Sequence, residues 1–143
     1  MTDPSEAGSR NTVLVVDDSP DGLQILNEVL KRQYEVRLAR SGEQALQAAQ
    51  QKPRPDAILL DIMMPGMDGY EVCSRLKASD ATRDIPVIFI TAKTDIEDAQ
   101  RGFDLGGADY ITKPILPPVV LARISTHIAL KLAREFVKGR TYI

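Results

Sequence analysis

The sequence predicts an open α/β fold in which a parallel β-sheet carries helices on both faces. The first sign is a set of short apolar runs rich in valine and isoleucine, which are typical of strands buried on both sides. The second is the regular alternation of these runs with segments of helical periodicity, because parallel strands need a helical crossover. The third is a polar residue shortly after four of the runs: Asp18, Asp61, Thr91 and Lys113.

Five segments of the chain have the composition of buried strands. Their β-branched residues favour a strand, and glycine, proline, aspartate or serine marks most of the turns between the segments. Right-handed crossovers would then bring their carboxyl ends to one edge of the sheet, where open α/β sheets bind ligands. The expected strands cover residues 12–16, 34–39, 57–60, 86–90 and 109–112.

A helical segment follows each strand, with apolar residues at spacings of three and four. Ser19 suits the N-cap of the first helix and Pro20 its first position. Pro53 ends the second helix, and Gly106 ends the fourth. The expected helices cover residues 20 to about 33, 41 to about 51, 69–78, 96 to about 105, and 117 to about 138.

Length and composition favour one domain that works in a reducing compartment. Of the 143 residues, 1–11 are expected to be a disordered lead-in, 12–127 the domain, and 128–143 a helical extension and tail. The single cysteine, Cys73, cannot form an internal disulfide and is expected to pack in the core. No apolar stretch approaches the ~20 residues of a membrane span, so a cytoplasmic location is expected. A formal net charge of −2 gives no reason to propose nucleic acid or a membrane as a partner.

Three carboxylates are expected to meet at the carboxyl edge of the sheet. Asp17 and Asp18 follow the first strand, and Asp61 follows the third. Unpaired carboxylates at close range repel and resist full ionisation, and a hard cation removes this conflict. Mg²⁺ prefers carboxylate and water oxygens. Taken alone, the Asp17–Asp18 pair is more often a helix cap or turn, and the other residues of the set favour the metal site.

Further residues at the same edge suit phosphoryl chemistry. Asp61 at a strand end can act as a nucleophile and form an aspartyl phosphate. The hydroxyl of Thr91 can bond a phosphoryl oxygen, and the small Ala92 after it leaves space. Lys113 can supply positive charge to a phosphate, and Pro114 after it allows a cis peptide bond that would aim the lysine. Each residue alone is more often a turn or linker residue, and only the combination predicts a site.

The stretches that hold these residues resemble a known family. They read VLVVDDSP, DAILLDIMMPGMDGYEVC, IPVIFITA and GGADYITKP. From residue 11 to about residue 127, the chain resembles the receiver domain of two-component response regulators in spacing, residue type and local context. The resemblance implies a doubly wound, flavodoxin-like sheet of five parallel strands in the order 2-1-3-4-5.

The resemblance also implies how the site would work. Asp61 would accept a phosphoryl group from a partner histidine kinase or histidine phosphotransfer protein. Asp18 and Asp61 would bind Mg²⁺ directly, together with the backbone carbonyl of Met63, and Asp17 would act mostly through water. Lys113 would pair with the phosphoryl oxygens. Such a domain is a signalling module rather than an enzyme, although it promotes its own phosphorylation and dephosphorylation.

Other residues are implied in switching and in the lifetime of the phosphorylated state. Thr91 would hydrogen-bond a phosphoryl oxygen, and Tyr110 would flip inward as Thr91 moves. Met63 and Lys93 would flank the site at positions that tune hydrolysis. Phosphorylation would change the face formed by the fourth helix, the fifth strand and the last helix, and so control an output.

The end of the chain departs from the family branch that dimerises through this face and binds DNA. Pro117–Pro118 opens the last helix without the acid of a Pro-x-Glu-Leu pattern, and Asp109 is a single acid where two are common. The last helix is also longer than a receiver needs, and its apolar residues continue to Phe136. This predicts a coiled coil, a homodimer or a link to an output domain, and a helix that folds back on its own domain is the alternative. The only histidine, His127, is expected to be a surface or interface residue.

Two other functions compete with the receiver. One is a Mg²⁺-dependent phosphohydrolase with an aspartyl-phosphate intermediate, which usually has a second acid two residues after the nucleophile. Met63 occupies that position here. The other is an interaction module that needs no phosphate, against which the complete set of acids, Thr91 and Lys113 argues.

Overall fold

The computed structural model describes residues 10–92 and 96–141, and every element expected from the sequence is present in it. The bounds differ from the predicted ones by no more than three residues. The strands are β1 (Thr12–Val16), β2 (Glu35–Ala39), β3 (Ala57–Asp61), β4 (Val87–Thr91) and β5 (Asp109–Thr112). The helices are α2 (Pro20–Leu30), α3 (Gly42–Gln50), α4 (Gly69–Ala78), α5 (Ile96–Asp104) and α6 (Pro117–Thr141).

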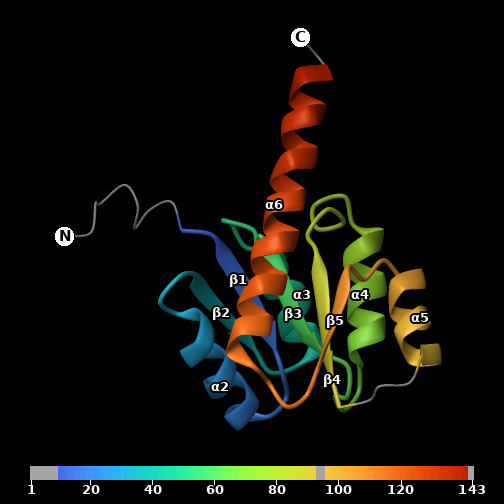
Figure 1. Cartoon of the computed structure of the whole chain (residues 1–143). Helices are drawn as coiled ribbons and strands as arrows, with labels where there is room; N and C mark the ends of the chain where they lie inside the picture. The colour runs from blue at the N-terminus through green and yellow to red at the C-terminus, as the bar shows by residue number, and fades with distance from the viewer. Residues whose placement is uncertain (1–9, 93–95, 142–143) are drawn as a thin grey trace.

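The five strands form one parallel sheet in the order β2-β1-β3-β4-β5, as the sequence predicts (Figure 1). Val16 is in register with Leu60, at the ends of β1 and β3. Asp61 pairs with Ile90 across β3 and β4, and Thr91 pairs with Thr112 across β4 and β5. The carboxyl ends of the strands therefore lie along one edge, which brings the predicted site residues together.

Two apolar cores cover the two faces of the sheet. On one face, α2 and α6 pack against alternate strand residues such as Val15 and Leu59. On the other, α3 and α4 pack against the intervening residues such as Leu14 and Leu60. Cys73 lies in this second core and is fully buried, as expected. Strands buried on both faces explain the continuous apolar runs in the sequence.

Local sequence fixes where the helices begin. The hydroxyl of Ser19 accepts a hydrogen bond from the Gly22 backbone N–H at 3.3 Å, which confirms the predicted cap of α2. Ser41 caps α3 in the same way. Asp68 caps α4 by accepting from the Glu71 N–H at 2.9 Å. These side chains satisfy backbone donors that have no partner within the helix.

The helix α6 is longer than the sheet that it covers. Val120, Ile124 and Ile128 on its first half are buried against the sheet. Beyond them α6 leaves the body of the domain (Figure 1), and large apolar side chains such as Leu132 and Phe136 are exposed. No helix within the described ranges is both long and apolar enough to cross a membrane.

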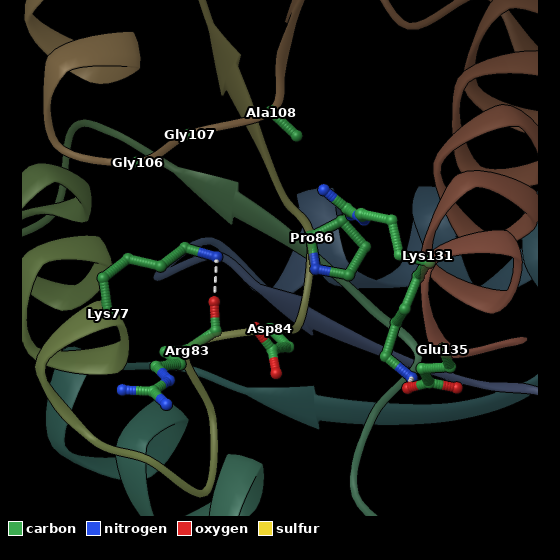
Figure 2. A pocket seen from close by; sticks show the side chains of 10 residues that line it. Lys77, Arg83, Asp84, Pro86, Gly106, Gly107, Ala108, Lys131 and Glu135 are labelled. Carbon is green, nitrogen blue, oxygen red and sulfur yellow. Dashed lines mark hydrogen bonds and ion pairs between the residues drawn. The ribbon is translucent and has the colours of Figure 1, made fainter. Parts of the chain in front are cut away.

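A cavity of about 420 Å³ lies at the opposite, amino-terminal edge of the sheet, between α4, the strand starts and α6 (Figure 2). Its charged groups are largely engaged with one another and with the backbone. The Lys77 amine donates to the carbonyls of Arg83 and Ile85 at 2.9 and 2.7 Å. Lys131 pairs with Glu135 at 2.8 Å. This cavity contains none of the predicted site residues.

Candidate functional site

The three predicted carboxylates meet at the carboxyl edge of the sheet. One oxygen from each of Asp17, Asp18 and Asp61 lies within 4.8 Å of the other two. Asp17 and Asp61 are only 3% and 5% exposed, and Asp18 is half-buried. Carboxylate oxygens at this spacing form the kind of donor set that hard divalent cations such as Mg²⁺ prefer. The residues present can hold such a cation.

The end of β1 positions Asp17 and Asp18. The Asp17 backbone N–H donates to the carbonyl of Ala39 at 3.1 Å, which ties the residue to β2. The backbone N–H of Ser19 donates to Oδ1 of Asp17 at 2.9 Å. The residue that caps α2 therefore also orients one carboxylate of the cluster.

The end of β3 positions Asp61, and the following loop supports it. The Met63 backbone N–H donates to Oδ1 of Asp61 at 3.3 Å. The Gly69 N–H donates to the carbonyl of Ile62 at 3.0 Å, which closes the loop. A Cβ at position 69 would lie 2.5 Å from the Asp61 carbonyl oxygen, so only glycine allows α4 to begin so close to the site.

Asp61 titrates unusually for an aspartate. The pKa of Asp61 is raised to about 6, mainly by burial and also by the nearby Asp17 and Asp18 carboxylates. The Lys113 ammonium and the Met63 N–H act in the opposite direction. Buried acids that share a site with like charges are typical of functional centres.

Thr91 and Lys113 lie at the ends of neighbouring strands at the same edge. Thr91 is buried at the end of β4, and Ala92 after it is exposed. The Lys113 backbone N–H donates to the Thr91 carbonyl at 2.9 Å. The Lys113–Pro114 peptide bond is cis, as the sequence predicted. Lys93, the other residue that the resemblance placed beside the site, lies outside the described residues.

A cavity of about 460 Å³ opens beside the acid cluster. Asp17 and Lys113 lie at its wall, and apolar side chains such as Ile25 and Ile115 complete it. The cavity therefore combines a carboxylate, an ammonium and apolar surface.

Tyr110 on β5 lies between α4 and α5, away from the acid cluster. Its hydroxyl is 3.2 Å from the hydroxyl of Tyr70, and its ring centroid is 5.1 Å from that of Phe89 and 5.4 Å from that of Phe103. A Cβ on Gly102 would overlap with the Tyr110 hydroxyl. The contact with Tyr70 could not be predicted from the sequence, because no spacing rule indicates which residues so far apart in the chain meet in the fold.

Two curated relatives match most of this chain. A protein of Vibrio cholerae named "Probable cyclic di-GMP phosphodiesterase" is 43% identical over 129 residues, which are 90% of this chain and 29% of that protein. The response regulator PleD of Caulobacter vibrioides is 41% identical over 129 residues, 90% of this chain and 28% of that protein. The chain thus spans less than a third of the length of either relative.

A solved structure and a family comparison agree with the fold. The chemotaxis protein CheY4 of Vibrio cholerae superposes with a TM-score of 0.78 at 32% identity, covering 82% of this chain and 98% of that one. The sequence model described as "Response regulator receiver domain" matches residues 13–125, a span that begins with β1 and ends within α6. Because the family model matches most of the chain and the fold agrees with it, the chain belongs to the receiver domain family of response regulators.

Proposed function

We propose that Asp61 is the phosphoacceptor of this receiver domain. The observation that carries the proposal is the convergence of three carboxylates within 4.8 Å at the strand edge that also holds Thr91 and Lys113. Receiver domains take their phosphoryl group from the phosphohistidine of a kinase or a histidine phosphotransfer protein. The buried, electronegative position of Asp61 suits a nucleophile that must meet an incoming phosphorus atom without competition from bulk water.

The transfer follows from the placement of charge. An Asp61 oxygen forms a bond to phosphorus as the phosphorus–nitrogen bond to the histidine breaks, and the imidazole nitrogen keeps the electron pair and takes up a proton. The transition state is loose, so positioning and charge neutralisation dominate. Lys113 pairs with phosphoryl oxygens, and the Thr91 hydroxyl donates to another. Attack of water on phosphorus later releases inorganic phosphate and restores the carboxylate.

Asp17, Asp18 and Asp61, with the backbone carbonyl of Met63, are the residues proposed to hold Mg²⁺. When bound, Mg²⁺ supplies positive charge to the phosphoryl oxygens. This assignment is supported by the raised pKa of Asp61, which reflects burial and the neighbouring Asp17 and Asp18 carboxylates. In this assignment, Asp17 acts mostly through water and the other two acids bind directly.

We further propose that phosphorylation reaches an output through Tyr110, β5 and α6. Tyr110 lies against α5, and α6 continues beyond the sheet (Figure 1). The relatives are more than three times as long as the part they share with this chain, and one is named a phosphodiesterase. An output domain or a second copy joined through α6 is therefore the expected partner, and no enzymatic output is assigned to this domain itself.

The phosphohydrolase alternative has little support. Its second acid would stand at Met63, and the exposed methionine there offers no proton-transfer group. An interaction module that works without phosphate remains the competing outcome of the experiment below.

The intact mass of the protein tests the proposal. The chain is incubated with Mg²⁺ and a small-molecule phosphodonor such as acetyl phosphate, beside the Asp61→Asn variant and a sample with chelator. We expect the mass of one phosphoryl group to be added in the wild type only when Mg²⁺ is present, and not in Asp61→Asn. A folded wild type that stays unmodified, even with a cognate kinase, would overturn the proposal in favour of the interaction module.

A further inference from the structure

Gly22 lies in the first turn of α2, so close to the Asp17 carboxylate that there is no room for a side chain. A Cβ built on Gly22 would overlap with Oδ2 of Asp17 and lie 2.8 Å from its Cγ. Glycine is unfavourable in a helix compared with alanine, so its presence in α2 needs a compensating role.

The contacts of Asp17 suggest what that role is. The backbone N–H of Ser19 donates to Oδ1 at 2.9 Å, and Oδ2 lies in the space that the absent side chain of Gly22 leaves. Asp17 is only 3% exposed, so neighbouring residues enclose its carboxylate. The two oxygens are thus fixed from two sides, one by a hydrogen bond and one by the backbone of α2.

We propose that Gly22 is a positioning residue of the metal site, which keeps the Asp17 carboxylate against α2 in the orientation that the cation requires. The inference rests on the proposed function of the acid cluster. It assigns to this chain a requirement for a residue without a side chain at position 22. Any larger residue would push Asp17 away from α2 and weaken its bond to the Ser19 N–H.

The Gly22→Ala variant separates this role from a general structural one. The overlap involves the end of one side chain and no backbone atom, so Asp17 can rotate and the variant is expected to fold. Residues that orient metal-site carboxylates typically change affinity by about tenfold or more when altered. We expect Gly22→Ala to weaken Mg²⁺ binding about tenfold, although alanine is the better helix former.

A double-mutant cycle tests whether the effect passes through Asp17. Mg²⁺ affinity is measured by calorimetric titration of the wild type, Gly22→Ala, Asp17→Asn and the double variant, with the exposed α2 substitution Gln24→Ala as the matched control. The Gly22→Ala loss is expected to disappear in the Asp17→Asn background, and Gln24→Ala to bind as the wild type does. Without Mg²⁺, the amide resonance of Ser19 is expected to shift in Gly22→Ala, because its hydrogen bond to Asp17 changes.

The inference is overturned if Gly22→Ala binds Mg²⁺ as tightly as the wild type, or if it loses the same factor when Asp17 is already asparagine. It is also overturned if the Ser19 amide resonance stays in place. A wild type that binds no Mg²⁺ would instead contradict the proposed metal site, and the inference with it. The two failures are distinguishable because the wild type is titrated in the same series.

Discussion

At the scale of single residues, the position of Asp61 carries an energetic cost to the fold. Burial, with help from Asp17 and Asp18, raises the pKa of Asp61 to about 6 from its ordinary value of 3.8. Between these values the folded protein binds more protons than the unfolded chain, so stability falls as pH rises. At about 1.4 kcal/mol per pKa unit, we expect Asp61→Asn to be more stable than the wild type by about 3 kcal/mol near pH 8 without Mg²⁺.

Urea unfolding at several pH values measures this effect. The advantage of Asp61→Asn is expected to vanish near pH 4, where Asp61 is protonated in the folded state. Asp80→Asn serves as the control, because the Asp80 side chain is 91% exposed and should give no such gain. Parallel pH profiles for the wild type and Asp61→Asn would show that Asp61 is not perturbed in this way.

The same scale shows where sequence reasoning works and where it stops. Asp18, Asp61 and Lys113 could be predicted as neighbours because parallel topology fixes where strand ends lie. The contacts of Tyr70 with Tyr110 and of Gly22 with Asp17 could not be predicted, because they depend on side-chain directions across two elements. These contacts form only when the folded chain fixes the side-chain rotamers and the positions of the helices.

At the scale of elements, hydrogen bonds and ion pairs between polar side chains connect β5 to α6. Asp109 on β5 accepts from Arg123 at 2.8 Å and pairs with His127 at 2.9 Å, both on α6. Arg123 also donates to the Tyr110 carbonyl at 3.0 Å. Asp109, which is a single acid where two are common, therefore forms its pairs within the chain. One of its partners is the half-buried His127. Helical spacing alone does not fix the rotation of α6 that creates these pairs.

The pKa of Asp109 gives the sign of a second prediction. Burial alone would raise this pKa, but hydrogen bonds from His127 and the Tyr110 N–H, together with the Arg123 charge, lower it overall. A lowered pKa means that the stabilisation is present above the ordinary pKa and is lost as pH falls through the folded value. We expect Asp109→Asn to lose about 1–2 kcal/mol of unfolding free energy at neutral pH and much less in strong acid.

The control for this variant is Glu71→Gln, which breaks the Arg75–Glu71 pair on α4. Both side chains of that pair are about half exposed, so the change should stay below about 0.5 kcal/mol. Chemical unfolding at neutral and strongly acid pH gives both values. Amide hydrogen exchange in α6 should also be faster in Asp109→Asn, and unchanged exchange would show that the pairs do not hold α6 in place.

At the scale of the whole molecule, the first half of α6 packs on the sheet, and the end of α6 extends from the body of the domain (Figure 1). Ile124 is fully buried and Ile128 nearly so, whereas Leu132 and Phe136 are 49% and 63% exposed. The boundary predicted after residue 127 thus lies one residue before Ile128, the last buried side chain among those described for α6. At the start of this extending part, Lys131 pairs with Asp56 of the body at 3.9 Å.

A chain that ends after Ala129 should therefore keep its fold, with an unfolding free energy within about 1 kcal/mol of the full chain, because weak ion pairs contribute little. By contrast, Ile124→Ala in the full chain should lose about 2–4 kcal/mol, since it removes a buried side chain and leaves a cavity. Urea unfolding, with phosphorylation followed by intact mass, measures both. A shortened chain that unfolds or no longer accepts the phosphoryl group would mean that the end of α6 stabilises the receiver rather than serving only to connect it to a partner.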